Sequence, residues 1–184
     1  MIDEIFVGGN MIFTQLETSR LFLKNIDQTD RAFIFSQFSD DDVNRYLFDA
    51  EPLTNIEEAD DIIGFYTVAE SRFQHRWILV RKEDGIKIGT CGFHCWDQKN
   101  RSIEMGYDLK KDFWGHGYMT EALKEIIDFA VNAMQIKSIQ ACISVDNSKS
   151  IDLIKKLGFV LTGSKDEHFR GKPYPHHLFT YNHQ

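Results

Sequence analysis

Cysteine and proline are scarce in this chain of 184 residues, which has three of each. An odd number of cysteines does not suggest the disulfide framework of a small secreted protein. Cys91, His94 and Cys95 resemble a set of metal ligands, but strand alternation would place His94 on the opposite face from the two cysteines. Their spacing is not that of a zinc knuckle, so we expect a buried apolar strand and no metal.

Long apolar runs and an excess of cationic residues are also missing. No apolar run approaches the roughly 20 residues needed to span a bilayer, and Asp3 and Glu4 stand where a signal peptide carries basic residues. The formal net charge is −7, which argues against nucleic acid because cationic contacts to phosphate dominate that binding. We therefore expect a cytoplasmic protein without membrane or nucleic-acid partners. Its acidic surface either concentrates cationic amines or serves solubility alone.

The common nucleotide-binding motifs are absent too. The segment Gly115-His116-Gly117-Tyr118-Met119-Thr120 is not a Walker A sequence, and Thr120 stands where a Rossmann fingerprint needs its third glycine. No ribose-binding acid or Mg²⁺ motif stands at the expected place. A nucleotide-binding module that takes ATP is therefore the weakest interpretation of this segment.

What the chain does contain is a pair of glycines between a predicted strand, Ile103 to Leu109, and a predicted amphipathic helix. A helix N-terminus has unpaired N–H groups and a partial positive charge, which attract phosphate oxygens. Glycine lets the backbone come close enough for several N–H groups to bond one anion. The glycine pair predicts a phosphate-bearing cofactor, although glycine at a helix end is also typical of a simple turn and cap.

Hydrophobic periodicity predicts the other elements, and no repeats or linkers interrupt them. Apolar runs bounded by turn residues indicate strands, and apolar residues three and four apart indicate helices. Thr54 and Glu57 predict a capping box at one helix start, and Gly158 predicts a left-handed helix end. Expected strands cover residues 20–24, 77–80, 86–96, 102–109, 138–145, 159–164 and 178–182. Expected helices cover 29–38, a segment from Thr54, a segment after the glycine pair, and 148–157, and residues 40–48 form a short helix or a turn.

This order of elements predicts an α/β (α+β) fold in one domain over residues 11–184, preceded by a loose extension over residues 1–10. The hairpin-linked strands from 77 to 109 give an antiparallel meander. The strand–helix–strand order from 103 to 145 gives a parallel, right-handed crossover. We therefore expect a single mixed, mostly antiparallel central sheet of six to seven strands with helices on both faces.

The ordered motifs resemble the GNAT superfamily of acetyl-CoA-dependent N-acetyltransferases, especially the RimJ/RimL-type branch of ribosomal-protein N-terminal acetyltransferases. The resemblance begins at Leu16-Glu17-Thr18-Ser19-Arg20-Leu21-Phe22-Leu23 and continues through residues 103–109 and the glycine pair. It ends with Asn147-x-x-Ser150 and Lys156-Leu157-Gly158-Phe159. Two positions depart from the superfamily. Asp112 replaces the Gln or Arg often found three residues before the first glycine, and the tyrosine of the helix before Leu157 is missing.

The resemblance implies a GNAT fold in which the strands 102–109 and 138–145 splay apart and hold the pantetheine arm of acetyl-CoA. Backbone groups of Tyr107, Asp108 and Leu109 would hold that arm, the amides of Trp114, Gly115, His116, Gly117, Tyr118, Met119 and Thr120 would hold the pyrophosphate, and Asn147 and Ser150 would complete the site. Asn147 equally suits a helix cap. The acid at Asp112 would weaken cofactor affinity unless its side chain points away.

The implied reaction is the attack of an amine on a thioester carbonyl, and a proton must first leave the amine because its pKa is about 10. Glu104 is the first candidate for the base, with an ordered water molecule as the other. Strand alternation places Glu104, Gly106 and Asp108 on one polar face, which suits a cleft. A strand N–H near Tyr107 would stabilise the oxyanion. Ser150 would protonate the leaving thiolate, and is otherwise a serine of the first helical turn.

These residues predict an acetyl-CoA-dependent N-acetyltransferase. The sequence leaves its acceptor open among a protein N-terminus, a polyamine and another small amine. The alternative is a degenerate domain that binds acetyl-CoA as a sensor or scaffold, which Asp112 and the missing tyrosine favour. Members of the branch are often monomers or homodimers, and the sequence does not choose. Tyr46, Trp96 and Tyr174 are candidates for the acceptor cavity, although aromatic residues more often lie in the core.

Overall fold

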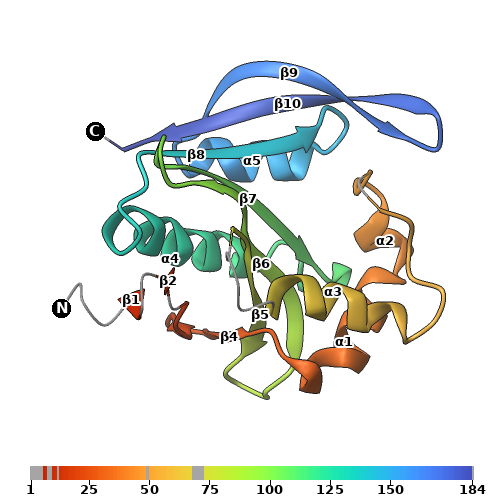
Figure 1. Cartoon of the computed structure of the whole chain (residues 1–184). Coiled ribbons are helices and arrows are strands. Elements are labelled where there is room, and N and C mark those ends of the chain that lie inside the picture. The colour runs from red at the N-terminus through yellow and green to blue at the C-terminus, as the bar shows by residue number, and fades with distance from the viewer. Residues whose placement is uncertain (1–5, 8–9, 12, 49, 68–72, 184) are drawn as a thin grey trace.

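The computed structural model describes residues 6–7, 10–11, 13–48, 50–67 and 73–183 of the chain (Figure 1). Near the N-terminus, β1 (Phe6–Val7) and β2 (Asn10–Met11) pair antiparallel in a small sheet of their own. The rest of the predicted loose extension over residues 1–10 lies outside the described residues and stays a prediction. In the described part of the chain, no helix is long and apolar enough to cross a membrane.

An eight-stranded mixed sheet forms the centre of the molecule. Its strands are β3 (Leu16–Glu17), β4 (Leu21–Asn25), β5 (His75–Arg81), β6 (Lys87–Asp97), β7 (Ser102–Leu109), β8 (Ser138–Ser144), β9 (Val160–Phe169) and β10 (Lys172–Asn182). They lie in the order β3-β4-β5-β6-β7-β8-β10-β9. Every neighbouring pair is antiparallel except β7 and β8, as predicted. The expected count of six to seven strands is too low because β3 pairs with β4 through only two residues, too few to leave a sequence pattern.

The hairpin of β9 and β10 is much longer than predicted. β9 continues to Phe169 and β10 begins at Lys172, whereas the expected strands end at residue 164 and begin at residue 178. Arg170 and Gly171 both have positive φ angles, 51° and 72°, which suits a tight two-residue hairpin turn. β9 is an edge strand that is exposed along most of its length, so no apolar alternation marks it in the sequence.

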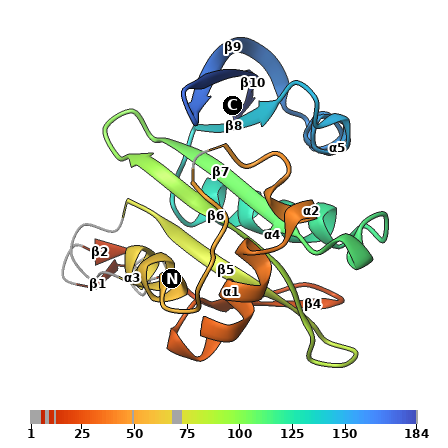
Figure 2. The ribbon, with the colours of Figure 1, turned by 90° about the vertical axis from the view of Figure 1, so that its right-hand side faces the viewer.

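Helices cover both faces of the sheet (Figure 2). They are η1 (Gln28–Asp30), α1 (Arg31–Phe38), α2 (Asp41–Asn44), α3 (Glu58–Thr67), η2 (Lys111–Phe113), α4 (Tyr118–Asn132) and α5 (Ser148–Lys156). On one face, Ile34 of α1 and Ile63 of α3 form a small apolar cluster with Ile78 of β5. On the other face, the buried stripe of α4 joins Trp77 and Phe93 in the main core.

The start of α3 lies one residue later than the predicted capping box. Asn55 Oδ1 accepts from the Glu58 N–H at 3.2 Å, and the Glu58 carboxylate accepts from the Asn55 N–H at 3.3 Å. Glu57 instead lies 3.6 Å from Arg31 in an ion pair. The patterns Thr54-x-x-Glu57 and Asn55-x-x-Glu58 overlap, and asparagine is at least as good an N-cap as threonine.

A β-bulge in β6 corrects the prediction that Cys91 and Cys95 share a face. The register against β7 shifts between His94 and Asp97, and Cys95 has a φ of 52°. Because a bulge adds one residue to its strand, Cys95 is exposed and Trp96 takes its place beside Cys91 in the main core. Trp96 is therefore a core residue.

Candidate active site

The two parallel strands of the sheet stay together over only a short distance. β7 and β8 pair at three positions, from Ser102–Ser138 to Glu104–Gln140. Residues 105–109 of β7 keep their partners in β6 but lie beyond this parallel ladder. Figure 1 shows the two strands diverging from their shared end. This edge of β7 is open to an extended ligand that pairs with strand backbone.

The predicted glycine turn lies at the start of α4. Gly115 and Gly117 have φ angles of 80° and 79°, in the left-handed region that glycine adopts without a Cβ clash. Gly117 is the N-cap of α4, and within the described residues no side chain caps the helix. The amides of its first turn, beginning at Tyr118, therefore point out of the helix end, as an anion site requires.

Two of the predicted backbone contacts are already used inside the chain. The Trp114 N–H donates to the Lys111 carbonyl at 3.0 Å, and the Trp114 indole N–H donates to the Leu109 carbonyl at 2.7 Å. Lys149 of α5 places its ammonium 4.6 Å from the centre of the Trp114 ring, so a cation stands beside the turn. Asp112 is exposed, so water and salt screen its charge.

A carboxylate that the sequence analysis missed holds the turn from its other side. Glu121, in the first turn of α4, accepts hydrogen bonds from Thr18 Oγ1 at 2.5 Å, from the Arg20 N–H at 2.8 Å and from Arg20 Nε at 2.6 Å. Arg20 Nη1 also donates to the His116 carbonyl at 3.0 Å, and its guanidinium lies 4.5 Å from the Tyr118 ring centre. These contacts fix the glycine turn against the β3–β4 connection.

Glu121→Gln is expected to lower the free energy of unfolding at neutral pH by about 1 to 3 kcal/mol, because the lost bonds are charge-assisted. Burial raises the pKa of Glu121, but the hydrogen bonds from Thr18 and Arg20 outweigh it and bring that pKa to about 2. A carboxylate whose pKa is lowered on folding stabilises the protein above its unfolded pKa, about 4.3. That contribution disappears as the pH falls through the folded pKa. The wild type and Glu121→Gln should therefore have similar free energies of unfolding at low pH.

Urea unfolding at about pH 7 and about pH 3 measures both effects. Glu125→Gln is the matched control, because Glu125 lies one turn along α4 and has no side-chain hydrogen bond among the described residues. An equal loss in the control, or a loss that does not shrink at low pH, would show that the Glu121 contacts do not stabilise the turn.

The start of α5 lies across the gap from β7. Asn147 Oδ1 accepts from the Ser150 N–H at 3.2 Å, so Asn147 caps the helix, one of its two predicted roles. The Tyr107 hydroxyl reaches across from β7 and donates to the Ser150 carbonyl at 3.4 Å. Burial raises the pKa of the Tyr107 hydroxyl, which therefore stays protonated at neutral pH. A tyrosine hydroxyl thus lies next to Ser150, although α5 itself contains no tyrosine.

Glu104 of β7 lies directly opposite His94 of β6 in the antiparallel register. The Glu104 Oε2 and His94 Nε2 atoms are 3.2 Å apart. The hydrogen bond from His94 lowers the pKa of the Glu104 carboxyl, and partial burial opposes this effect. The sequence pattern marks His94 only as a candidate metal ligand, so it does not reveal this pair. The hairpin turn at residues 97–100 predicts that β6 and β7 pair antiparallel, but the bulge before Asp97 sets the register that brings His94 opposite Glu104.

Asp108 does not lie on an open polar face, as strand alternation suggested. It is 8% exposed, and α1 covers this end of β7. Its carboxylate accepts from Gln37 Nε2 at 2.7 Å, from Thr90 Oγ1 at 2.5 Å and from Arg76 Nη1 at 2.9 Å. Alternation gives the face of the sheet on which a side chain lies, but not which helix covers that face. The open part of the face ends before Asp108.

Aromatic side chains connect the segment after α2 to strand β10. Phe48, which follows α2, stacks on Tyr174 of β10 with ring centres 4.0 Å apart. Arg170, in the β9–β10 turn, forms an ion pair with Glu51. The hairpin is thereby held against the connection between α2 and α3.

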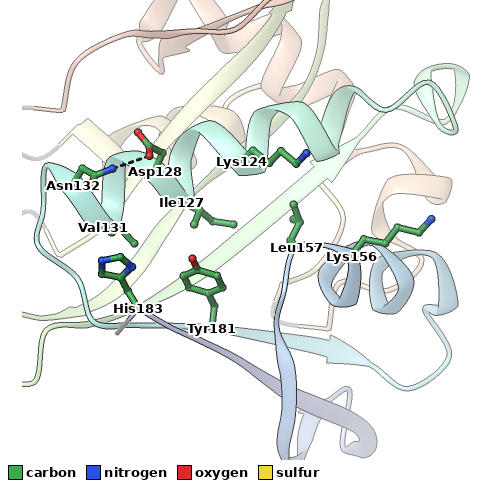
Figure 3. Close-up of a pocket in the computed structure, with 9 residues that line it drawn as sticks. All are labelled: Lys124, Ile127, Asp128, Val131, Asn132, Lys156, Leu157, Tyr181 and His183. Atoms are coloured by element: carbon green, nitrogen blue, oxygen red, sulfur yellow. Dashed lines mark hydrogen bonds between the residues drawn. The ribbon is translucent and has the colours of Figure 1, made fainter.

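A cavity of about 320 Å³ lies between α4, the end of α5 and the end of β10 (Figure 3). Its lining includes Lys124, Asp128, Lys156, Tyr181 and His183. None of the residues predicted to bind the cofactor is among the described residues that line it. The cavity is therefore not part of the glycine turn.

Comparisons with known proteins agree with this geometry. Residues 20–160 match the family model described as Acetyltransferase (GNAT) domain. The chain is 32% identical over 172 residues to the uncharacterized N-acetyltransferase YoaA of Bacillus subtilis (strain 168), with 92% of this chain and 97% of YoaA covered. It is 24% identical over 141 residues to the spermidine N(1)-acetyltransferase of Escherichia coli (strain K12), with 77% and 73% covered.

Solved structures have the same fold at low sequence identity. RimL, a ribosomal L7/L12 alpha-N-protein acetyltransferase in complex with coenzyme A, matches with a TM-score of 0.83 at 16% identity over 92% of this chain and 98% of RimL. The spermidine N-acetyltransferase from Vibrio cholerae, in complex with CoA and spermine, matches with a TM-score of 0.79 at 19% identity over 89% and 96%. The family match over residues 20–160 and the relative YoaA show that the chain belongs to the GNAT acetyltransferase family.

Proposed function

We propose that this protein is an acetyl-CoA-dependent N-acetyltransferase that moves an acetyl group to a primary amine by direct attack. The observation that carries the proposal is that two features occur together. Strands β7 and β8 separate after Glu104, and α4 begins at an uncapped turn with two left-handed glycines. The separated strands suit an extended pantetheine arm, and the helix start suits a pyrophosphate.

Backbone groups would hold most of the acetyl-CoA, which supplies the activated thioester carbonyl. The amides of Gly115, His116, Gly117, Tyr118, Met119 and Thr120 would bind the pyrophosphate, Tyr107, Asp108 and Leu109 would bind the arm, and Asn147 and Ser150 would contact it from α5. The ring of Trp114 would border the site, because its amide is already bonded. Lys149, over that ring, supplies a positive charge that offsets the exposed Asp112.

The main chemical task of the chain is to take a proton from the acceptor. Because an alkylamine has a pKa of about 10, less than roughly one part in a hundred is nucleophilic at neutral pH. Glu104 belongs to the last residue pair of the parallel ladder, where the gap opens, and would contribute the base directly or through an ordered water. A β7 N–H near Tyr107 would stabilise the charge that develops on the carbonyl oxygen.

Ser150 would give a proton or a hydrogen bond to the departing thiolate. It lies in the first turn of α5, across the gap from β7, and the Tyr107 hydroxyl bonds to its carbonyl. Ser150 would thus take over proton donation from the tyrosine that α5 lacks.

We propose a cationic amine as the acceptor. The relatives described above include enzymes named for spermidine and for ribosomal protein, which are a polyamine and a peptide N-terminus. The net charge of −7 favours the approach of a cationic acceptor of either kind.

A degenerate domain that binds acetyl-CoA as a sensor or scaffold is the second candidate. The acid at Asp112 and the absence of a tyrosine from α5 favour it. The two candidates share the cofactor site and differ in turnover.

Calorimetric titration with acetyl-CoA, with ATP as the control, tests the cofactor. We expect selective binding in the micromolar range. Comparable affinity for ATP would favour a nucleotide-binding module, and failure to bind acetyl-CoA would mean that the glycine turn is only structural. Acceptors are then screened by following thiol release with polyamines and N-terminal peptides, and binding without turnover on any of them would favour the sensor.

A further inference from the structure

The pair of His94 and Glu104 stands where the gap between the parallel strands begins. Glu104 is the last residue of β7 to face a residue of β8, and His94 is its partner on the other side, in β6. Their side chains are 35% and 31% exposed, so the pair is neither sealed in the core nor a fully solvated surface pair. An acceptor amine that reaches the gap from this face of the sheet would meet these two side chains.

The imidazole of His94 has one nitrogen engaged and the other turned toward the backbone of Gly106. Nε2 is the atom that lies 3.2 Å from the Glu104 carboxylate. A Cβ at Gly106 would lie 3.2 Å from His94 Cε1 and 3.7 Å from Nδ1. Because Gly106 has no side chain, it does not cover the Nδ1 edge of the His94 imidazole. When a neutral imidazole donates from Nε2 to a carboxylate, its Nδ1 carries the lone pair that accepts a proton.

The two groups of the pair differ in their strength as proton acceptors. The hydrogen bond from His94 lowers the pKa of Glu104, which makes this carboxylate a weaker base than an ordinary glutamate. An imidazole ordinarily titrates at about pH 6.5, closer to neutral than any carboxyl. General-base catalysis is most effective when the base titrates near the working pH.

We propose that the catalytic base is His94 and not Glu104 itself: the Nδ1 of His94 takes the proton from the acceptor ammonium, and Glu104 positions the imidazole. This role rests on the proposed acetyltransferase function. The ammonium gives one proton to Nδ1 and becomes a nucleophilic amine. The amine then forms the C–N bond while charge develops on the carbonyl oxygen, and the C–S bond breaks as that charge collapses. The second proton of the amine reaches the departing sulfur through the Ser150 hydroxyl, and the imidazolium returns its proton to water. Glu104 stabilises the imidazolium as a carboxylate does in a serine-protease triad.

Other ionisable groups lie near the pair: Arg76 of β5, Cys95 of β6, Cys142 of β8, and Lys165 and Glu167 of β9. The Arg76 charge is balanced by the Asp108 carboxylate at 2.9 Å, and Lys165 is balanced by Glu167 at 2.6 Å. Burial raises the pKa of Cys142 to about 11, so this thiol is neutral near pH 7. Glu104 is therefore the dominant charge acting on the imidazole.

The pH dependence of kcat/KM in His94→Gln tests this role. We expect kcat/KM of the wild type to fall as the pH is lowered, because a protonated imidazole cannot take the proton of the ammonium. In His94→Gln, kcat/KM at neutral pH should drop about 100-fold or more and the acid limb should vanish, with the acetyl-CoA Kd unchanged within about twofold. His168→Gln, an exposed histidine of β9, is the matched control and should behave as wild type.

Nitrogen NMR of isotope-labelled histidine supplies a reading that does not depend on turnover. The neutral His94 imidazole should carry its proton on Nε2, and the Nδ1–H form would overturn the role because Nδ1 would then have no lone pair to offer. An acid limb that survives in His94→Gln would overturn the role of His94 alone. A wild type that binds acetyl-CoA but acetylates no amine would overturn this role together with the proposed function.

Discussion

Gly117→Glu is expected to weaken acetyl-CoA binding by at least about 100-fold while the protein stays folded. The substitution puts a negative charge at the N-cap of α4, the place proposed for the pyrophosphate. Two anions cannot share the partial positive charge of one helix end, and the side chain also fills the space that the glycine leaves. Calorimetric titration measures the affinity, and thermal unfolding reports whether the fold is kept.

Gly117→Gln separates the charge from the bulk and from backbone strain. Both variants force a side chain onto a φ of 79°, which costs on the order of 1 to 2 kcal/mol in stability. A Cβ at this position lies 3.5 Å from Arg20 Nη2 and is therefore accommodated without a backbone clash. We expect the glutamine variant to lose about tenfold in affinity or less. Unchanged acetyl-CoA affinity in a folded Gly117→Glu would remove the glycine turn from the cofactor site.

Glu104→Gln is expected to lower kcat about 100-fold and to leave the Kd for acetyl-CoA unchanged within about twofold. The glutamine still accepts a hydrogen bond from His94 Nε2, but it no longer carries the charge that stabilises a protonated imidazole or takes up a proton itself. Steady-state kinetics with an amine acceptor measure the first quantity, and calorimetry measures the second. Glu83→Gln, at an exposed position of the β5–β6 turn, is the matched control.

The same variant separates the enzyme from the sensor. A wild type that shows no turnover with any amine, while binding acetyl-CoA, would support a sensor or scaffold. If the wild type does turn over, a Glu104→Gln protein with full kcat would exclude Glu104 from proton removal and leave His94 or an ordered water as the base.

The local sequence determined much of the fold and of the glycine turn. The stripe of apolar residues at helical spacing predicts α4, and the glycine pair before it predicts a turn, which the positive φ angles of Gly115 and Gly117 confirm. Gly158 is confirmed in the left-handed conformation after α5. Each of these features depends on residues within a few positions of one another, so the sequence pattern contains the whole cause.

Edges and irregularities of the sheet were harder to predict. The two residues of β3 are too short to show a period, and the outer part of β9 is polar on both sides because it faces water. The bulge at Cys95 reverses the face of the residues after it, because side chains alternate and one extra residue shifts them all.

Only the tertiary structure decided which side chains meet at the site. Glu121 bonds to Arg20 across 101 positions of sequence, and Gln37 covers Asp108 across 71. His94 comes to lie against Glu104 because β6 and β7 pair in one particular register. Local patterns give the elements and their buried faces, because the interactions that form an element are short-range. The ion pairs and the gap between β7 and β8 arise from packing among elements far apart in the chain, and no local pattern encodes that packing.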